Sequence, residues 1–228
     1  MPAPISIIIP TLDAATELPS CMSSLLPGLS EGLVREVLIV DGGSEDDTCR
    51  LAKASGARIF TQQTRGRGPQ MNIGANAARG DWLLFLHADT ALSADWAERA
   101  AAHIYEHADK AAAFTLAFKS DARMARIVAN RANWRARVLG LPYGDQGLLI
   151  SKPLFTALGG FPDTPFMEDV AFIRRLRSNQ LRILASEART SAAKYEQTGW
   201  RKRSWHNLFL LLRFLLGAKP ENLARRYR

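Results

Sequence analysis

Three short acidic loops carry side chains whose types and spacing suit chemistry on a phosphorylated ligand. They are Asp41-Gly42-Gly43-Ser44, His87-Ala88-Asp89-Thr90 and the adjacent pair Glu168-Asp169. A carboxylate can accept a hydrogen bond from a base N–H or a ribose hydroxyl, and glycines beside it let a ligand lie close to the backbone. Mg²⁺ or Mn²⁺ takes one or two carboxylates together with substrate phosphates. One acid of an adjacent pair can act as general base on an acceptor hydroxyl.

Each of these loops also has a purely structural interpretation that the sequence leaves open. Ser44 can cap a following helix with Asp47 as the reciprocal acid, and Asp89 can cap the segment after it. The Glu168-Asp169 pair at a helix start can simply favour the helix dipole. A fourth polar loop, Gly144-Asp145-Gln146, either holds an acceptor or makes a turn.

The elements that must position these loops alternate between apolar runs and helical patterns. Runs such as Ile5–Ile9 and Trp82–Leu86 are almost entirely apolar, which predicts a parallel sheet covered by helices on both faces. Ligands of such sheets bind at the carboxyl ends of the strands. We therefore expect Thr11, Asp13 and the Asp41 and Asp89 loops to gather along one edge. The strands expected in this half are 5–9, 37–40, 57–61 and 82–86, with helices over 14–26, 46–55 and 69–78.

The second half of the chain is less regular, and it contains no repeat or clear linker. The patterns predict helices over 93–107, 121–139, 168–178, 201–216 and 221–227. They predict strands over 111–118 and 181–184, and a turn followed by a strand over 144–151. We expect residues 1–195 to form one α/β domain. Residues 196–228 are then a basic helical appendage that packs on this domain or lies at a membrane surface.

The basic character of the chain comes from its C-terminal segment. Of 228 residues, 30 are Lys or Arg and 22 are Asp or Glu, which gives a net charge of +8. Residues 201–228 hold eight of the basic side chains and a single acid, Glu221. Such a segment suits an anionic partner, acidic lipid or nucleic acid, or it is a solvated helix face. Its Trp, Phe and Leu residues favour a membrane surface over nucleic acid.

The sequence shows neither a signal peptide nor a membrane span. It opens on the strand-like run Ile5–Ile9. The longest apolar run, Leu208–Leu212, is broken by Arg213 and is shorter than the roughly 20 residues that a span needs. Cys21 and Cys49 do not make a disulfide scaffold. We expect a cytoplasmic protein, with peripheral contact at the inner face of the membrane as a further expectation.

The order of these motifs resembles that of the family 2 glycosyltransferases, which have the GT-A fold. The resemblance covers about residues 5–180 and is strong because many short motifs follow in the order of the family. The chain is also similar to a subgroup of short bacterial members with an "RGRG…LFLHADT" stretch. The motifs are Pro10-Thr11, Asp41-Gly42-Gly43-Ser44 with Asp46 and Thr48, Arg65-Gly66-Arg67-Gly68, Asn72-Ile73-Gly74, Ala78-Arg79-Gly80-Asp81 and Glu168-Asp169.

The resemblance implies a nucleotide-sugar donor, with a UDP type favoured, and a divalent metal, Mg²⁺ or Mn²⁺. Asp41 would bind the base, and Asp89 would hold the metal on the donor diphosphate. The usual Asp-x-Asp metal motif has His87 in its first position here, so His87 is a weaker candidate ligand. The other donor contacts that the resemblance implies are Pro10, Thr11, Asp13, Gly42, Gly43, Arg65 and Arg67.

For the reaction, the resemblance implies that Asp169 deprotonates the acceptor hydroxyl, with Glu168 beside it, and that the sugar is transferred with inversion. Asp145 and Gln146 are the expected acceptor contacts. A sugar-phosphate nucleotidyltransferase is the nearest rival, but its Gly-rich loop would follow the first strand, where Thr11–Ala15 has no glycine. A non-enzymatic basic module for membrane or nucleic acid is the other rival, and only the C-terminal segment supports it.

Overall fold

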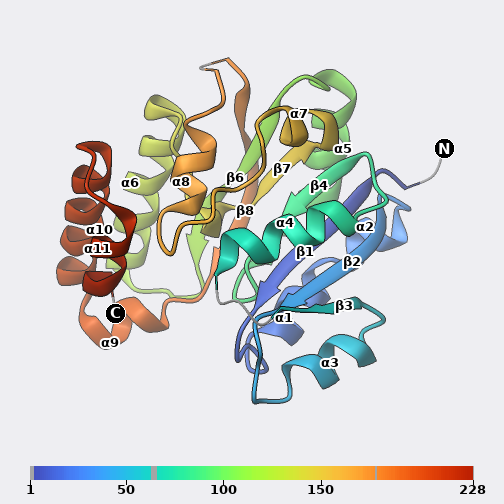
Figure 1. Cartoon of the computed structure of the whole chain (residues 1–228), viewed down its shortest axis with the longest axis horizontal. Coiled ribbons are helices and arrows are strands. Elements are labelled where there is room, and N and C mark those ends of the chain that lie inside the picture. The colour runs from blue at the N-terminus through green and yellow to red at the C-terminus, as the bar shows by residue number, and fades with distance from the viewer. Residues whose placement is uncertain (1–2, 63–65, 178, 228) are drawn as a thin grey trace.

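One eight-stranded mixed sheet forms the centre of the computed structural model, which describes residues 3–62, 66–177 and 179–227. Its strands lie in the order β3-β2-β1-β4-β7-β6-β8-β5 (Figure 1). Within this described sheet, all strands but β7 and β5 run in the same direction. The expected α/β architecture with a mostly parallel sheet is confirmed. The strands are β1 (Ile5–Thr11), β2 (Val34–Asp41), β3 (Arg58–Thr61), β4 (Trp82–Phe85), β5 (Ala91–Leu92), β6 (Ala111–Phe118), β7 (Leu148–Ser151) and β8 (Leu181–Thr190).

The four strands β3-β2-β1-β4 form the parallel half of the sheet. Successive side chains of a strand point to opposite faces, so Ile7 and Ile9 join one buried cluster and Ile8 joins the other. Burial on both faces explains why β1 is almost entirely apolar. Because β1 and β2 are parallel and in register, Thr11 lies beside Asp41 at the carboxyl edge of the sheet.

Helices cover both faces of the sheet, as expected (Figure 1). On the face of α4, Gly74 lies so close to Ile8 that a Cβ would stand 2.4 Å from the Ile8 Cγ2 atom. Glycine is therefore what lets this helix approach the sheet. One face carries α1 (Leu18–Ser24), α2 (Leu26–Ser30), α3 (Thr48–Ala54) and α5 (Trp96–Glu106), and the other carries α4 (Arg67–Ala77), α7 (Lys152–Ala157) and α8 (Glu168–Ile173).

Several expected element boundaries are wrong. The helix expected over 14–26 is only α1, Leu18–Ser24, and a second short helix, α2, follows from Leu26. Pro27 has no N–H and is tolerated there because it lies in the first turn of α2. The strand expected over 181–184 continues to Thr190, since β8 pairs along the whole of β6 and also with β5. The helix expected over 93–107 begins only at Trp96, and neither α7 nor α9 (Ala193–Thr198) was expected.

Three further helices lie at the far end of the sheet: α6 (Arg123–Leu139), α10 (Trp200–Leu215) and α11 (Pro220–Tyr227) (Figure 1). Leu210, Leu211 and Leu223 are buried together with Phe166 and Met167, which directly precede α8. The C-terminal helices therefore pack on the α/β part of the chain. Within the described ranges, no helix combines the length and the apolar composition that crossing a membrane requires.

Candidate functional site

Asp41 is held by four hydrogen bonds at the end of β2, where the residue is only 2% exposed. Its Oδ1 accepts from the hydroxyls of Thr11 at 2.9 Å and Ser44 at 2.5 Å. Its Oδ2 accepts from the backbone N–H groups of Gly43 at 3.0 Å and Ser44 at 2.8 Å. Burial alone would raise the pKa of Asp41, but these hydrogen bonds outweigh burial and lower the pKa. The ionised carboxylate therefore fixes the shape of this loop.

The loops after β1 and β2 are tied to each other. The Oδ1 atom of Asp13 accepts from the N–H of Glu45 at 2.9 Å, and the Asp13 N–H donates to the Ser44 Oγ at 2.9 Å. Asp13 has a φ of 49°, in the left-handed region that Asp tolerates better than most residues. The interpretation of Ser44 as a helix cap is wrong, because α3 begins only at Thr48 and the Ser44 hydroxyl donates to Asp41.

Gln70, which was not predicted, joins the ends of β1 and β2. Its Nε2 donates to the carbonyl of Thr11 at 2.9 Å and to that of Val40 at 2.8 Å. A Cβ on Gly42 would lie 3.0 Å from this nitrogen, so glycine leaves room for the amide. Pro10 is buried within β1 opposite Val40. The only sequence signal for Gln70 is a polar residue in the first turn of a helix that packs on the sheet.

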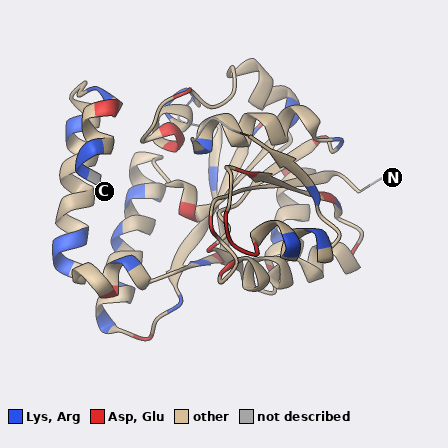
Figure 2. Ribbon diagram, turned by 60° about the horizontal axis from the view of Figure 1, so that its bottom comes forward, with Lys and Arg blue, Asp and Glu red and all other residues tan. Residues whose placement is uncertain are grey.

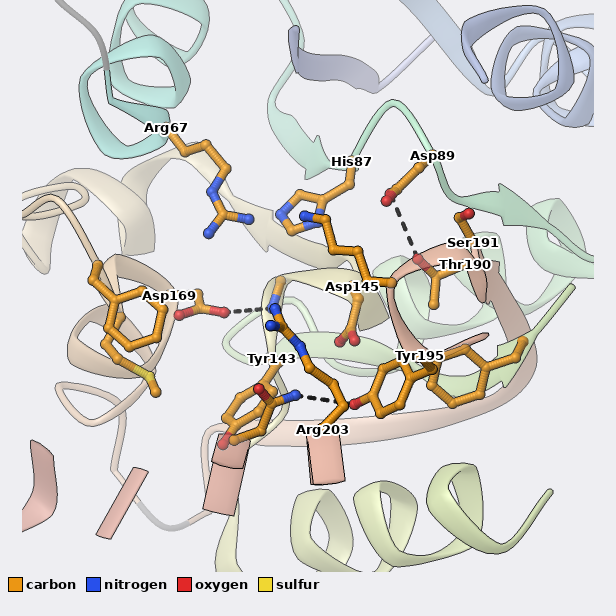
Figure 3. Close-up of a pocket in the computed structure, with 16 residues that line it drawn as sticks. Arg67, His87, Asp89, Tyr143, Asp145, Asp169, Thr190, Ser191, Tyr195 and Arg203 are labelled. Carbon is orange, nitrogen blue, oxygen red and sulfur yellow. Dashed lines mark hydrogen bonds between the residues drawn. The ribbon is translucent and has the colours of Figure 1, made fainter. Parts of the chain in front are cut away.

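A second group of predicted residues surrounds a cavity of about 150 Å³ (Figure 3). The loop after β4, the first turn of α4, the single turn η1 (Gly144–Gln146) and α8 form its inner walls, while the end of β8, α9 and α10 form the outer one. The Asp41 loop is not part of this lining. The polar lining residues are Arg67, His87, Asp89, Tyr143, Asp145, Asp169, Thr190, Ser191, Lys194, Tyr195, Arg203 and Asn207.

Asp169 is aimed into the cavity by the turn opposite it (Figure 3). Its Oδ2 accepts from the N–H of Gly144 at 2.6 Å, and its Oδ1 accepts from the N–H of Val170 at 2.7 Å. A Cβ on Gly144 would lie 2.6 Å from the His87 Nε2 atom, so only glycine fits here. Just before the acidic pair, Met167 takes a φ of 59°, a left-handed conformation that costs energy for a non-glycine residue.

Glu168 takes a different position from its neighbour. Its side chain is 3% exposed, and its Oε1 lies 2.9 Å from the Nε of Arg67. Burial raises the pKa of Glu168, and the Arg67 guanidinium opposes that rise. Glu168 therefore anchors Arg67, whose guanidinium lines the cavity with Asp169 (Figure 3). Arg65, the other arginine predicted to contact the donor, lies outside the described residues.

His87 and Asp89 follow β4 and both line the cavity. Burial, with the nearby Arg67 charge adding to it, lowers the pKa of His87 to about 4, so its ring is neutral at neutral pH. The Asp89 Oδ1 has only long contacts with the hydroxyls of Thr90 at 3.3 Å and Thr190 at 3.5 Å within the described chain. A carboxylate and a neutral ring nitrogen are both ligands for divalent metals.

These two residues do not complete a metal site by themselves. Among the described residues, no three His, Cys, Asp or Glu side chains are gathered in a way that could hold a metal ion. Mg²⁺ and Mn²⁺ sites in enzymes often combine one or two carboxylates with substrate phosphates and water. The residues present therefore fit a divalent cation that a bound diphosphate helps to hold.

Asp145 and Gln146 lie in one turn but take different positions. Asp145 lines the cavity, and burial raises its pKa to about 6 although the Arg135 charge opposes the rise. Its Oδ1 is buried with no hydrogen-bond partner among the described residues. Gln146 is fully buried, and its Nε2 donates to the Phe114 carbonyl at 2.8 Å. The structure therefore brings Asp145 to the cavity, while Gln146 is not among the lining residues.

The wall formed by α9 and α10 was not predicted as part of the site. Asn207 of α10 donates to the hydroxyl of Tyr195 on α9 at 3.1 Å, and Arg203 extends into the cavity from α10 (Figure 3). Facing this wall is Tyr143, whose ring carries the Arg135 guanidinium 3.5 Å above its centre. Burial raises the pKa of Tyr143 and keeps its hydroxyl protonated. No motif in the sequence marks these helices as cavity walls.

Asn72 connects α4 to the segment that leads to α8. Its Nδ2 donates to the Phe161 carbonyl at 2.8 Å, and the Phe161 N–H donates to its Oδ1 at 2.9 Å. Beside this pair, a Cβ on Gly68 would lie 2.6 Å from the Pro162 carbonyl oxygen, so the two segments are in close contact. Both elements that carry cavity residues, α4 and the segment before Asp169, are thereby fixed to each other.

Sequence comparisons match residues 6–156 to the family described as glycosyl transferase family 2. A PGL/p-HBAD biosynthesis glycosyltransferase of Mycobacterium bovis is 42% identical over 115 residues, which are 47% of this chain and 44% of that protein. A glucosyl-3-phosphoglycerate synthase of Mycolicibacterium paratuberculosis is 34% identical over 93 residues, 37% of this chain and 28% of the relative. The chain thus spans less than half the length of these curated relatives.

Solved structures share this arrangement of strands and helices. S. aureus TarS 1-349 in complex with UDP-GlcNAc has a TM-score of 0.64 at 19% identity, covering 82% of this chain and 58% of that one. Glucosyl-3-phosphoglycerate synthase from Mycobacterium tuberculosis, in complex with Mn²⁺, UDP and glucosyl-3-phosphoglycerate, has a TM-score of 0.61 at 20% identity, covering 90% and 78%. At these identities the likeness is one of fold, and it confirms the expected GT-A arrangement.

Proposed function

Because the chain belongs to glycosyl transferase family 2, whose family model covers residues 6–156, we propose that it moves a sugar from a nucleotide-sugar donor to an acceptor hydroxyl. The placement of Asp169 carries this proposal. Its carboxylate is fixed by the Gly144 N–H at 2.6 Å and shares one cavity with Asp89 (Figure 3). Asp169, as the base for the acceptor, and Asp89, as the carboxylate for the metal and diphosphate, therefore lie on two sides of a space that a sugar can enter.

In this proposal the donor is of the UDP type, and its nucleotide binds the loops after β1 and β2. The TarS and glucosyl-3-phosphoglycerate synthase structures hold UDP-GlcNAc and UDP, which supports this choice. The Asp41 loop is fixed by its own hydrogen bonds, so Asp41 shapes the base pocket without further rearrangement. Asp13, Pro10-Thr11 and Gly42-Gly43 complete the walls of that pocket.

A divalent metal, Mg²⁺ or Mn²⁺, completes the donor site at Asp89, with His87 as the weaker candidate ligand. The Mn²⁺ and UDP in the glucosyl-3-phosphoglycerate synthase complex support this assignment. When bound, the metal neutralises charge on the leaving diphosphate. Arg67, which Glu168 holds at 2.9 Å, adds a charge-assisted contact to the same diphosphate.

Asp169 is the proposed general base. It takes the proton of the acceptor hydroxyl while that oxygen attacks the anomeric carbon, and the bond from this carbon to the diphosphate oxygen breaks with its electron pair. Attack from the side opposite the leaving group inverts the configuration. Glu168 is a positioning residue, because it acts through Arg67. The acceptor lies between Asp145 and the wall formed by α9 and α10.

The catalytic unit is formed by residues 1–195, and residues 196–228 cover it. We place the enzyme at the inner face of a membrane, with residues 201–228 as the contacting segment and no nucleic acid among its partners. Basic side chains flank Trp205, Leu208 and Phe209 on both sides, with Arg201 to Arg203 before them and Arg213 after them. This is the composition of helices that lie at a bilayer interface.

A donor screen tests the proposed activity. UDP-, GDP- and dTDP-sugars are incubated with the chain and MnCl₂, and the released nucleotides are separated by chromatography. We expect UDP from UDP-sugars only when metal is present, and we expect Asp89→Asn to abolish this release. Asp109→Asn, at an exposed acid in a distant turn, serves as the matched control. If the chain releases no UDP from any donor but releases pyrophosphate from a nucleoside triphosphate and a sugar phosphate, the proposed activity is wrong and the chain is a nucleotidyltransferase.

A further inference from the structure

The helix α10 presents large apolar side chains to solvent. They recur at the three- and four-residue spacing that places side chains on one side of a helix. Their exposed fractions lie between 42% and 87%. The opposite side of α10 is occupied too, since Leu210 and Leu211 are buried against the segment before α8. The five residues with these exposed fractions, on α10 and at its C-terminal end, are Trp205, Leu208, Phe209, Leu212 and Leu216, and Leu215 of α10 is 37% exposed.

The neighbouring helix α6 also exposes large apolar side chains. It contacts α10 (Figure 1) and exposes Trp134, Val138 and Leu139 by 59%, 61% and 54%. These three residues and the five of α10 form what we call the α6–α10 apolar surface. Groups of exposed apolar side chains mark interaction sites, whereas single exposed apolar residues are ordinary.

The charges on the two helices indicate which partner covers this surface. All charged residues of α6 and α10 are Lys or Arg, and the ribbon in Figure 2 shows their positions distributed along both helices. Two copies of the chain that met through this surface around a two-fold axis would bring like charges together. An anionic lipid bilayer instead compensates them, at about 1 kcal/mol for each Lys or Arg near its surface.

We propose that the α6–α10 apolar surface docks on an anionic lipid bilayer, with its aromatic side chains at the level of the lipid headgroups and its basic side chains against the lipid phosphates. The inner side of the same α10 lines the cavity through Arg203 and Asn207. Docking therefore places the cavity about one helix diameter, roughly 10 Å, from the bilayer. It follows, if the proposed transferase activity holds, that the acceptor hydroxyl is carried by a membrane lipid.

Flotation of the full chain with vesicles tests the apolar half of the surface. We expect the chain to float with vesicles of phosphatidylcholine and phosphatidylglycerol, to float far less with phosphatidylcholine alone, and to be released by salt. The double variant Trp205→Gln, Phe209→Gln should bind at least about 100-fold more weakly, since each of the two buried aromatics contributes at least about a factor of ten. Leu26→Gln, Leu29→Gln, which are 60% and 44% exposed on α2, form the matched control and should bind like the unmodified chain.

A second pair of variants tests the basic half. Arg201→Gln, Lys202→Gln removes two exposed charges from α10 and should weaken binding to the anionic vesicles about 30-fold. Lys53→Gln, Arg79→Gln removes two exposed charges elsewhere and should change nothing. All four side chains are exposed, so thermal unfolding should confirm that every variant is folded.

Several outcomes would overturn the docking. These are no flotation of the intact chain, equal flotation with neutral vesicles, or binding to RNA without binding to vesicles. A dimer seen by ultracentrifugation that Trp205→Gln, Phe209→Gln dissociates would assign the surface to a second copy instead. Titration with UDP separates the two proposals. Binding of UDP without binding of vesicles would refute only the docking proposal. Binding of vesicles without binding of UDP would refute only the transferase proposal.

Discussion

The carboxyl group of Asp145 should make the stability of the protein depend on pH in the direction opposite to that of most acids. Its burial raises its pKa to about 6, whereas Asp in an unfolded chain has a pKa of about 3.9. The folded state thus binds this proton more tightly than the unfolded state. The resulting contribution to the free energy of unfolding is therefore full below about pH 4, falls as the pH rises to about 6, and stays lost above that.

The size of this effect follows from the two pKa values. They differ by about 2, which corresponds to about 3 kcal/mol at about 1.4 kcal/mol for each pKa unit. The Asp145→Asn variant cannot ionise and does not lose this contribution. Relative to the wild type, we expect it to gain about 2 to 3 kcal/mol between about pH 4 and about pH 8. For a chain of this length the gain is roughly 5 to 10 °C in Tm.

Thermal unfolding followed by circular dichroism at several values between about pH 4 and about pH 8 measures this change. The test is whether the stability difference between the variant and the wild type changes with pH. Any effect of packing the amide itself is the same at every pH and does not alter this change. Asp95→Asn is the control: hydrogen bonds from Ser93 and Ser186 lower the pKa of Asp95. The stability that the ionised Asp95 contributes is therefore lost only below about pH 4, so the difference between this variant and the wild type should be nearly constant from about pH 4 to about pH 8. A flat difference for Asp145→Asn over the whole range would refute the reasoning.

Three further substitutions test the cavity and its supports. Asp169→Asn removes the proposed base, so kcat should fall by about 10² to 10⁴ while UDP affinity, measured by calorimetry, stays unchanged. Gly144→Ala places a Cβ 2.6 Å from the His87 Nε2 atom, so we expect at least a roughly tenfold loss of kcat in a chain that still folds, and full activity would show that the turn can move. Asn72→Ala removes both hydrogen bonds to Phe161 and should lower the free energy of unfolding, measured in urea, by about 1 to 3 kcal/mol. Asn72→Asp keeps the acceptor for the Phe161 N–H, so its free energy of unfolding should lie between those of the wild type and Asn72→Ala.

The parallel half of the fold was predictable because each of its elements carries its own local signal. The strands β1, β2 and β4 can be recognised without knowing which strands they pair with, since strands buried on both faces are apolar along their whole length. The start expected at Ala14 was wrong because residues 15–17 form a turn, and the buried positions with helical spacing, Leu18, Cys21 and Leu25, begin only after it. The length of β8 failed because its pairing with both β6 and β5, rather than its own composition, extends it to Thr190.

The candidate site was predictable in its positions but not in its orientations. Glu168 and Asp169 are neighbours, yet the first pairs with Arg67 while the second faces the cavity. Asp145 and Gln146 are neighbours too, yet Asp145 lines the cavity while Gln146 is buried in the core. Adjacent residues in a turn point in different directions, and only the surrounding packing decides which one meets a ligand. The α9–α10 wall carries no local signal, because the strongest pattern of α10 is its apolar one.

The two anchors on either side of residues 163–165 have a consequence for how proteins of this architecture diversify. Phe161 is fixed by the amide of Asn72, and Asp169 is fixed by the backbone of Gly144. A connecting segment whose ends are both held can change in length and composition at little entropic cost, and such loops tolerate insertions better than the elements that they join. New acceptor preferences can therefore evolve in this segment by insertion and deletion, without a matching change in the residue that takes the proton.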